Sequence, residues 1–135
     1  MGMGATGVIY VPTACQNGAR CKLHIHFHGC GAMYDFLGLY YVNYIGFNEV
    51  AEANNIIILY PQASLSTENP INPEGCFDIY GYLNDNMQYL TKDGVQISRI
   101  WNMARRISSD NVFTEFFKGF AQGIQVNSTD PSYCV

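Results

Sequence analysis

The sequence predicts an α/β fold with a mostly parallel sheet, and three neighbouring segments indicate it. Residues 22–27 alternate polar and apolar side chains, which is the period of a β-strand. Residues 56–60 form a continuous apolar run, typical of a strand buried on both faces of a parallel sheet. Residues 43–54, between them, place apolar side chains on one helical face. This order predicts a βαβ unit with a right-handed crossover.

A further strand is expected over residues 8–11, a short apolar segment closed by a proline. Asn17-Gly18 is a strong tight-turn signal, so the simplest interpretation is a hairpin into the next strand. Cys15 and Cys21 flank this turn and are the simplest disulfide pair. Five cysteines nevertheless leave other connectivities open.

The remaining segments up to residue 109 are expected to be loops and one long helix. Residues 29–39 and 61–89 have the composition of loops, and a loop as long as the second is usually functional or mobile. Residues 91–107 predict a helix, with capping-box spacing between Asp93 and Gln96. Its apolar stripe would consist of Ile97, Ile100, Trp101, Ala104 and Ile107.

We divide the chain into an α/β domain, residues 1–109, and a C-terminal helix with an irregular tail, residues 110–135. The helix would begin near Asn111, with Asp110 as its N-cap. Its stripe would consist of Phe113, Phe116, Phe117 and Phe120. Such a stripe is more often core packing than a membrane- or polymer-binding face. Cys134 is the odd cysteine, either free or paired outside this chain.

Composition excludes several classes of function. A net charge of −4 and the lack of a basic patch argue against a nucleic-acid partner. No apolar run is long enough to span a membrane. Five cysteines and the glycosylation sequon at Asn127 favour an extracellular protein. Residues 1–6 do not resemble a signal peptide, so we expect the export signal to lie outside this chain, which would then be a fragment.

Three histidines, His24, His26 and His28, alternate along the strand that ends at residue 28. Three imidazoles can bind zinc, but ligands spaced along one strand rarely converge on a tetrahedral ion. We therefore expect hydrogen-bonded histidines and no metal site. No cofactor is expected either.

The turn formed by His28, Gly29 and Cys30 is the strongest candidate site. In α/β-hydrolases, backbone N–H groups of an H-G loop often stabilise the oxyanion of the tetrahedral intermediate. The alternative is an ordinary strand-to-loop turn containing a glycine. The dipeptide alone does not separate the two interpretations.

Six further segments, in this order, carry a more specific signal: GVIYVP (7–12), CKLH and FHGC within 21–30, GFNEVA (46–51), NNIIILYPQA (54–63), NPEGCFD (72–78) with GY (81–82), and TKDGVQ (91–96). Together they resemble the corresponding segments of fungal-type poly(3-hydroxybutyrate) depolymerases. The resemblance covers about residues 7–107 and does not extend into the tail. It implies a circularly permuted α/β-hydrolase with three αβα layers. This chain would be an incomplete half of that fold, the C-terminal half.

The resemblance also implies site residues. The Cys30 N–H would be one oxyanion donor, within the turn of His28 and Gly29. Cys30 and Cys76 would form a disulfide that pins this turn to the long loop. Phe77 stands where relatives often have Trp, and we expect it to bind substrate together with Asp78. Tyr34 would line the cleft, although ordinary packing explains it equally well. The implied substrate is an ester or a hydroxyalkanoate polyester.

No nucleophile elbow of the G-x-S-x-G type is present, and no serine has the required strand–turn–helix context. The nucleophile and base would therefore belong to a missing N-terminal half. The leading interpretation is a fragment of a secreted carboxylic ester hydrolase. The alternatives are a non-catalytic secreted binding module, or a pseudo-enzyme that pairs with a separately encoded half.

Overall fold

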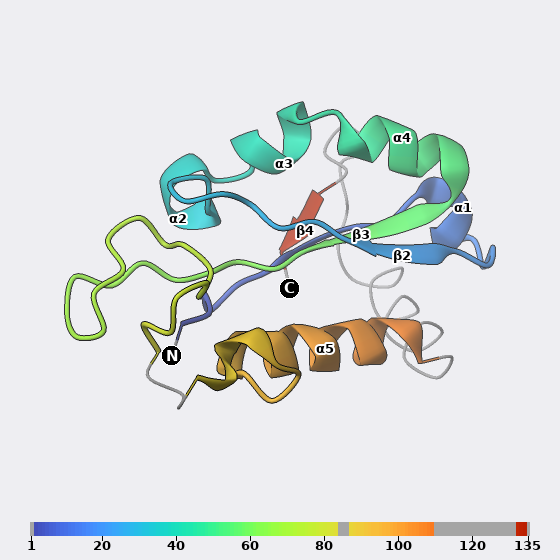
Figure 1. The fold of residues 1–135 in the computed structure, drawn as a ribbon. Helices are drawn as coiled ribbons and strands as arrows, with labels where there is room; N and C mark the ends of the chain where they lie inside the picture. Colours follow the sequence, from blue (N-terminus) through green and yellow to red (C-terminus); the bar gives the residue numbers. More distant parts are fainter. Residues whose placement is uncertain (1, 84–86, 110–131, 135) are drawn as a thin grey trace.

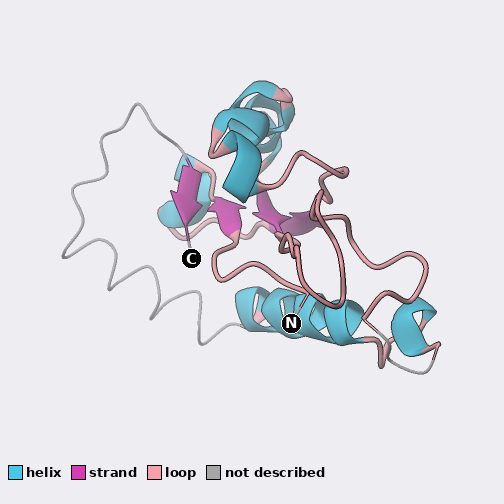
Figure 2. Cartoon of the chain, turned by 90° about the vertical axis from the view of Figure 1, so that its left-hand side faces the viewer, coloured by secondary structure: helices cyan, strands magenta, loops and turns pink. Residues whose placement is uncertain are grey.

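The computed structural model describes residues 2–83, 87–109 and 132–134. Its centre is a four-stranded sheet of order β2-β3-β1-β4. The strands are β1 (Val8–Tyr10), β2 (Lys22–Ile25), β3 (Ile56–Tyr60) and β4 (Ser132–Cys134). Helices α3 (Tyr40–Tyr44) and α4 (Phe47–Asn54) lie over one face and α5 (Val95–Ser108) over the other (Figure 1). Figure 2 shows the same layers from the side.

The described part of the sheet is mixed, and this corrects the prediction of a mostly parallel sheet. β2 and β3 pair in parallel with α4 between them, as the predicted strand–helix–strand unit requires. β1 pairs antiparallel with both β3 and β4. For β1 to run parallel to β2 and β3, the connection from β1 to β2 would need a crossover of roughly a dozen residues or more. The shorter connection between Tyr10 and Lys22 reverses the direction of the chain instead.

The predicted hairpin between β1 and β2 is wrong, because β3 lies between the two strands. The Asn17-Gly18 signal has another use here. Asn17 ends helix α1 (Thr13–Gln16), and Gly18 follows with φ of +92°. Helix C-termini and hairpin turns both need a residue with positive φ, so one dipeptide serves either structure.

The helical layer above the sheet is more broken than the sequence predicted. Helix α2 (Tyr34–Leu37) forms within the expected loop 29–39. The helix predicted over residues 43–54 is two helices, α3 and α4. They are separated at Gly46, whose φ of +81° interrupts the helical path. The predicted end is confirmed, since Asn55 caps α4 in the left-handed conformation.

Helix α5 is confirmed, but its predicted capping box and apolar stripe are only partly right. Gly94 is the N-cap, and no side-chain hydrogen bond caps the start of the helix. Gln96 is buried and bonds distant segments instead of the helix start. Ile100 and Ala104 are buried as predicted, whereas Ile97 and Trp101 are exposed. A short 3-10 helix, η1 (Gln88–Leu90), precedes α5.

Two apolar clusters fill the two faces of the sheet. Alternation along β1 separates them, with Val8 and Tyr10 in the first and Ile9 in the second. The first cluster contains Val8, Tyr10, Val42, Ala51, Ile58 and Tyr60, and the second contains Ile9, Val11, Cys15 and Ile57. Because β1 and β3 are buried on both faces, the end of β3 is a rigid support for the loops that follow it.

Some predictions fall outside the described residues, namely the Phe-rich helix from about residue 111 and the sequon at Asn127. Ser132–Cys134, in the tail expected to be irregular, form β4. Among the described residues, no helix combines the length and apolarity needed to cross a bilayer.

Candidate functional site

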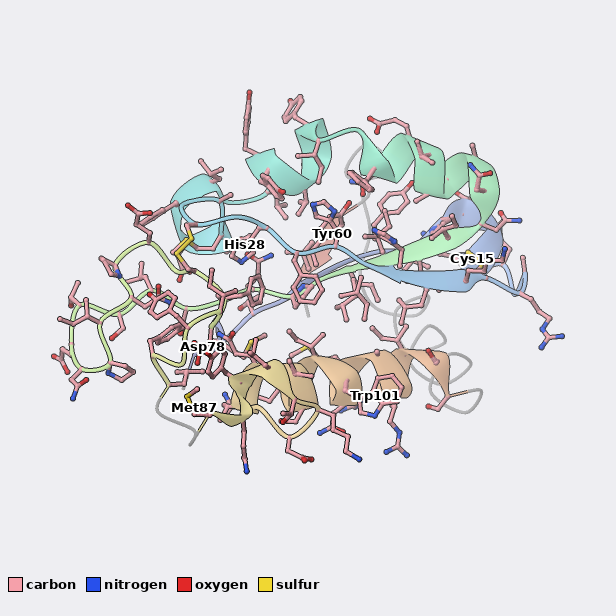
Figure 3. The ribbon with its side chains drawn as sticks, in the orientation of Figure 1. Cys15, His28, Tyr60, Asp78, Met87 and Trp101 are labelled. Atoms are coloured by element: carbon pink, nitrogen blue, oxygen red, sulfur yellow. A yellow bond between two sulfur atoms is a disulfide. The ribbon has the colours of Figure 1, made fainter. Side chains whose placement is uncertain are left out.

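The candidate turn begins where β2 leaves the sheet. The chain continues beside β3 for one more step, with the His26 N–H donating to the Leu59 carbonyl at 2.9 Å. It then reverses in a turn closed by the Ala32 N–H and the Gly29 carbonyl, 3.2 Å apart. Figure 3 shows His28 and Asp78 at the same end of the molecule, away from Cys15.

Two links attach this turn to the long loop. Cys30 and Cys76 form a disulfide with their Cα atoms 4.4 Å apart. The Gly31 N–H also donates to the Glu74 carbonyl at 2.8 Å. The second disulfide, Cys15–Cys21, joins α1 to the start of β2. Both pairings are those expected from the sequence. The turn is therefore held from two sides and its backbone has little freedom.

The Cys30 N–H has no hydrogen-bond acceptor among the described residues, and Cys30 is exposed. The adjacent N–H groups of Gly31 and Ala32 are both bonded within the protein. An oxyanion donor must be fixed in position yet available to the ligand. Of the N–H groups of Cys30, Gly31 and Ala32, that of Cys30 has both properties.

His28 is buried beneath the turn, with 5% of its surface exposed. Its Nε2 lies 3.1 Å from the Ala63 N–H and its Nδ1 lies 2.8 Å from the Gly29 carbonyl. Burial lowers the pKa of the imidazole, and the bond to the Gly29 carbonyl opposes this shift. Because both nitrogens have protein partners, His28 has no free nitrogen with which to act as a general base.

Phe77 forms an aromatic wall beside the turn. Its ring lies 4.7 Å from that of His28 and meets Phe27 edge to face at 5.2 Å. The sequence analysis did not predict Phe27 as a residue of this site, because strict alternation along the strand places it on the face opposite His28. Regular strand geometry ends at Ile25, so the rule no longer applies two residues later. Phe27 is half exposed and contributes apolar surface at the turn.

Comparison with known proteins gives relatives of one kind, although no family model matches the chain. A poly(3-hydroxybutyrate) depolymerase of Delftia acidovorans is 43% identical over 110 residues, covering 80% of this chain and 21% of that protein. A polyhydroxybutyrate depolymerase of Talaromyces funiculosus is 38% identical over 117 residues, covering 80% and 34%. The chain is homologous to part of the poly(3-hydroxybutyrate) depolymerases.

Solved depolymerase structures agree with this relationship. The crystal structure of the PHB depolymerase from Penicillium funiculosum matches 77% of this chain with a TM-score of 0.72 at 36% identity, and 35% of that protein is covered. A PHB depolymerase complexed with an R3HB trimer matches 57% of the chain and 27% of its own length, with a TM-score of 0.55 at 41% identity. The chain thus spans about a fifth to a third of the relatives it matches.

Asp78 is buried, and its carboxylate organises the long loop of this depolymerase homologue. Oδ1 accepts from the Tyr80, Gly81 and Tyr82 N–H groups at 3.3, 2.6 and 3.0 Å, and Oδ2 accepts from the Leu83 N–H at 3.1 Å. A carboxylate with both oxygens bonded to backbone amides has little capacity left for a ligand. These contacts therefore favour a role for Asp78 in holding the loop in place, rather than the direct contact with substrate that the sequence analysis predicted.

Asn72 is a second centre of the loop that the sequence did not single out. Its Nδ2 lies within 3.0 Å of the Ser64 carbonyl, the Cys76 carbonyl and the Tyr82 hydroxyl. Its Oδ1 accepts from the Cys76 N–H at 2.9 Å. Asn72 therefore fixes Cys76, and through the disulfide it supports the candidate turn. A lone asparagine in a Pro- and Gly-rich segment gave no signal of this role.

Tyr34 packs against the core cluster beneath α3 and α4, and its backbone N–H donates to Gln62 Oε1 at 2.7 Å. Of the two interpretations that the sequence left open, these contacts favour packing. Gln62 also donates to the Tyr60 carbonyl. Tyr34 thus links α2 to the segment that follows β3.

The other two histidines have aromatic partners. His24 stacks on Phe47 at 5.7 Å, and His26 Nε2 lies 3.1 Å from the Tyr41 hydroxyl. Burial is the largest cause that lowers the pKa of His26, followed by the charges of His24 and His28. Among the described residues, Cys30, Glu74 and Cys76 form the only cluster with metal-ligand spacing, and its two sulfurs are joined in the disulfide.

Proposed function

We propose that this chain provides the oxyanion-binding turn and part of the substrate wall of a carboxylic ester hydrolase. Its substrates would be poly(3-hydroxybutyrate) or related hydroxyalkanoate esters. The observation that carries the proposal is the Cys30 N–H, exposed and without an acceptor among the described residues, on a turn held by a disulfide. The identity of 38–43% to depolymerases supports the substrate class.

In ester hydrolysis, attack on the carbonyl carbon places negative charge on the carbonyl oxygen. A fixed backbone N–H that meets this oxygen stabilises the transition state by about 2.7–4 kcal/mol. We assign this donor to Cys30. The nucleophile and base are assigned to a part of the enzyme other than this chain, since its serines lack an elbow and His28 has no free nitrogen.

The wall beside the donor suits a short aliphatic ester. Phe27 and Phe77 present an edge-to-face aromatic pair next to the turn. Hydroxybutyrate units carry methyl and methylene groups between their ester groups, and apolar walls with a few polar contacts are typical of small-ligand sites. A related depolymerase has been solved with an R3HB trimer. We therefore infer that the two phenylalanines contact the acyl chain.

Secretion belongs to the same proposal. The two disulfides need an oxidising compartment to form and persist. Glycosylation at Asn127 remains a prediction. The competing interpretation is a binding module or pseudo-enzyme, and the lack of a nucleophile elbow in this sequence favours it.

A chimera separates these possibilities. The matching segment of the Talaromyces depolymerase is replaced by this chain, and hydrolysis of a 3-hydroxybutyrate trimer is measured. We expect a kcat within about tenfold of the parent, because one donor replaces an equivalent donor. Loss of an oxyanion donor would lower kcat by about 10²–10³. A folded chimera that binds the trimer with such a loss would refute catalysis and favour the binding module.

A matched control tests the position of the turn within this chimera. The double variant Cys30→Ser/Cys76→Ser retains both backbone N–H groups but removes the disulfide. Cys15→Ser/Cys21→Ser removes the disulfide at the other end of β2. We expect the first pair of substitutions to lower kcat and the second to leave it near the level of the chimera.

A further inference from the structure

The peptide group between Gly29 and Cys30 carries both the candidate donor and the acceptor that holds it. This peptide is trans, so its carbonyl and its N–H point in opposite directions. Fixing the Gly29 carbonyl therefore fixes the direction of the Cys30 N–H. The carbonyl has two partners, the Ala32 N–H at 3.2 Å and His28 Nδ1 at 2.8 Å.

The contacts of His28 determine which of its nitrogens carries the proton. Nε2 faces the Ala63 N–H, which is a donor, so Nε2 must be an unprotonated acceptor. Nδ1 faces a carbonyl oxygen, which only accepts, so Nδ1 must carry the proton. Only the neutral Nδ1–H tautomer makes both bonds. The imidazolium and the Nε2–H tautomer would each direct an N–H at the Ala63 N–H.

We propose that His28, as the neutral Nδ1–H tautomer, is the positioning residue that aims the Cys30 N–H at the substrate oxygen. Ala63 anchors the ring to the segment after β3, and the ring orients the Gly29–Cys30 peptide. This role rests on the proposed function, because only that function gives the Cys30 N–H a ligand. The new element is the role of His28, which touches no substrate and carries its proton on Nδ1.

The first measurement uses the full chain without any substitution. Long-range ¹H–¹⁵N correlation NMR at neutral pH reports the protonation of each ring nitrogen. We expect a protonated Nδ1 and an unprotonated Nε2 for His28. An Nε2–H tautomer or an imidazolium would overturn the proposal.

Two variants then separate the two hydrogen bonds. In His28→Asn, the side-chain amide takes a position close to that of Nδ1 and can donate to the Gly29 carbonyl, but nothing replaces Nε2. In His28→Gln, the side-chain oxygen can reach the Ala63 N–H, but no donor remains at Gly29. A role limited to anchoring Ala63 predicts that Gln is the better substitute. The positioning role predicts that Asn is.

Hydrogen exchange and ligand titration read out the difference. The Ala32 N–H shares the Gly29 carbonyl, so its exchange should accelerate about tenfold in His28→Gln, as expected for loss of one hydrogen bond, and much less in His28→Asn. Addition of a 3-hydroxybutyrate trimer should shift the Cys30 amide resonance in the unsubstituted chain and in His28→Asn. The shift should be at least halved in His28→Gln.

Each outcome decides one of the two proposals. Equal Cys30 responses in both variants, or a better response in His28→Gln, would overturn the positioning role. A trimer that leaves the Cys30 amide unshifted in the unsubstituted chain would refute the proposed function. In that case the tautomer and the Ala32 exchange rates still show whether His28 holds the peptide.

Discussion

Removing the Cys30–Cys76 disulfide should destabilise the chain more than removing Cys15–Cys21. The bonded cysteines are 46 residues apart in the first disulfide and 6 in the second. In the chain-entropy model, closing loops of these lengths lowers the entropy of the unfolded state by amounts worth about 4 and about 2 kcal/mol at 25 °C. The double serine variants should differ by about 2 kcal/mol in free energy of unfolding.

Urea unfolding of the full chain, followed by far-UV circular dichroism, measures this difference. The free energy of unfolding extrapolated to water should fall for both double variants, and further for Cys30→Ser/Cys76→Ser, whose unfolded chain loses the larger restricted loop and should also give the steeper slope. The variant lacking Cys15–Cys21 is the matched control, because it loses the same kind of bond but one that closes the shorter loop. Equal losses, or a larger loss in the control, would refute the loop-length reasoning and indicate that native contacts dominate.

Three further changes test the packing around the sheet and the turn. Tyr60→Phe should cost about 1–3 kcal/mol, because the buried Asn48 Oδ1 loses the hydroxyl that bonds it at 2.8 Å. Gly75→Ala should lower the melting temperature, since φ is +56° and a Cβ would overlap the buried side chain of Met33. Stability should also fall as the pH drops below about 6.5. The pKa of His28 is lowered in the fold, so the unfolded chain binds the proton more readily.

Matched controls belong to these tests. Tyr44→Phe changes an exposed tyrosine and should have little effect in thermal unfolding. Gly18→Ala also places an alanine at positive φ, but its Cβ would lie in open space. It should therefore lower the melting temperature less than Gly75→Ala does. His28→Asn lacks a titrating ring and should show a weaker loss of stability in acid. A Gly18→Ala loss equal to that of Gly75→Ala would contradict the overlap with Met33.

The elements that the sequence predicted well depend on local signals. The apolar run of β3 and the Asn55 cap of α4 act within a few residues, and both are where the sequence expected them. The failures have non-local causes. Gln96 had capping-box spacing, yet its amide accepts from the Asp78 N–H and donates to the Gly2 carbonyl, both at 2.6 Å. A buried polar side chain is bonded where the tertiary structure offers partners, which short-range spacing does not reveal.

The candidate site depends on the long loop more than on the strand that leads into it. The turn residues themselves were predictable, because strand alternation ends at His28 and the resemblance names the turn. The contacts that hold them were not predictable. Ala63 lies 35 positions from His28, Cys76 lies 46 positions from Cys30, and Asn72 is linked to the turn through its bond to Cys76.

Substitutions at Asn72, whose bond to Cys76 links it to the turn, should therefore loosen the turn. Asn72→Ala should accelerate exchange of the Gly31 amide, whose acceptor is in the same loop, while the amides of β3 remain protected. Unchanged Gly31 exchange in a folded Asn72→Ala chain would show that the disulfide alone holds the turn.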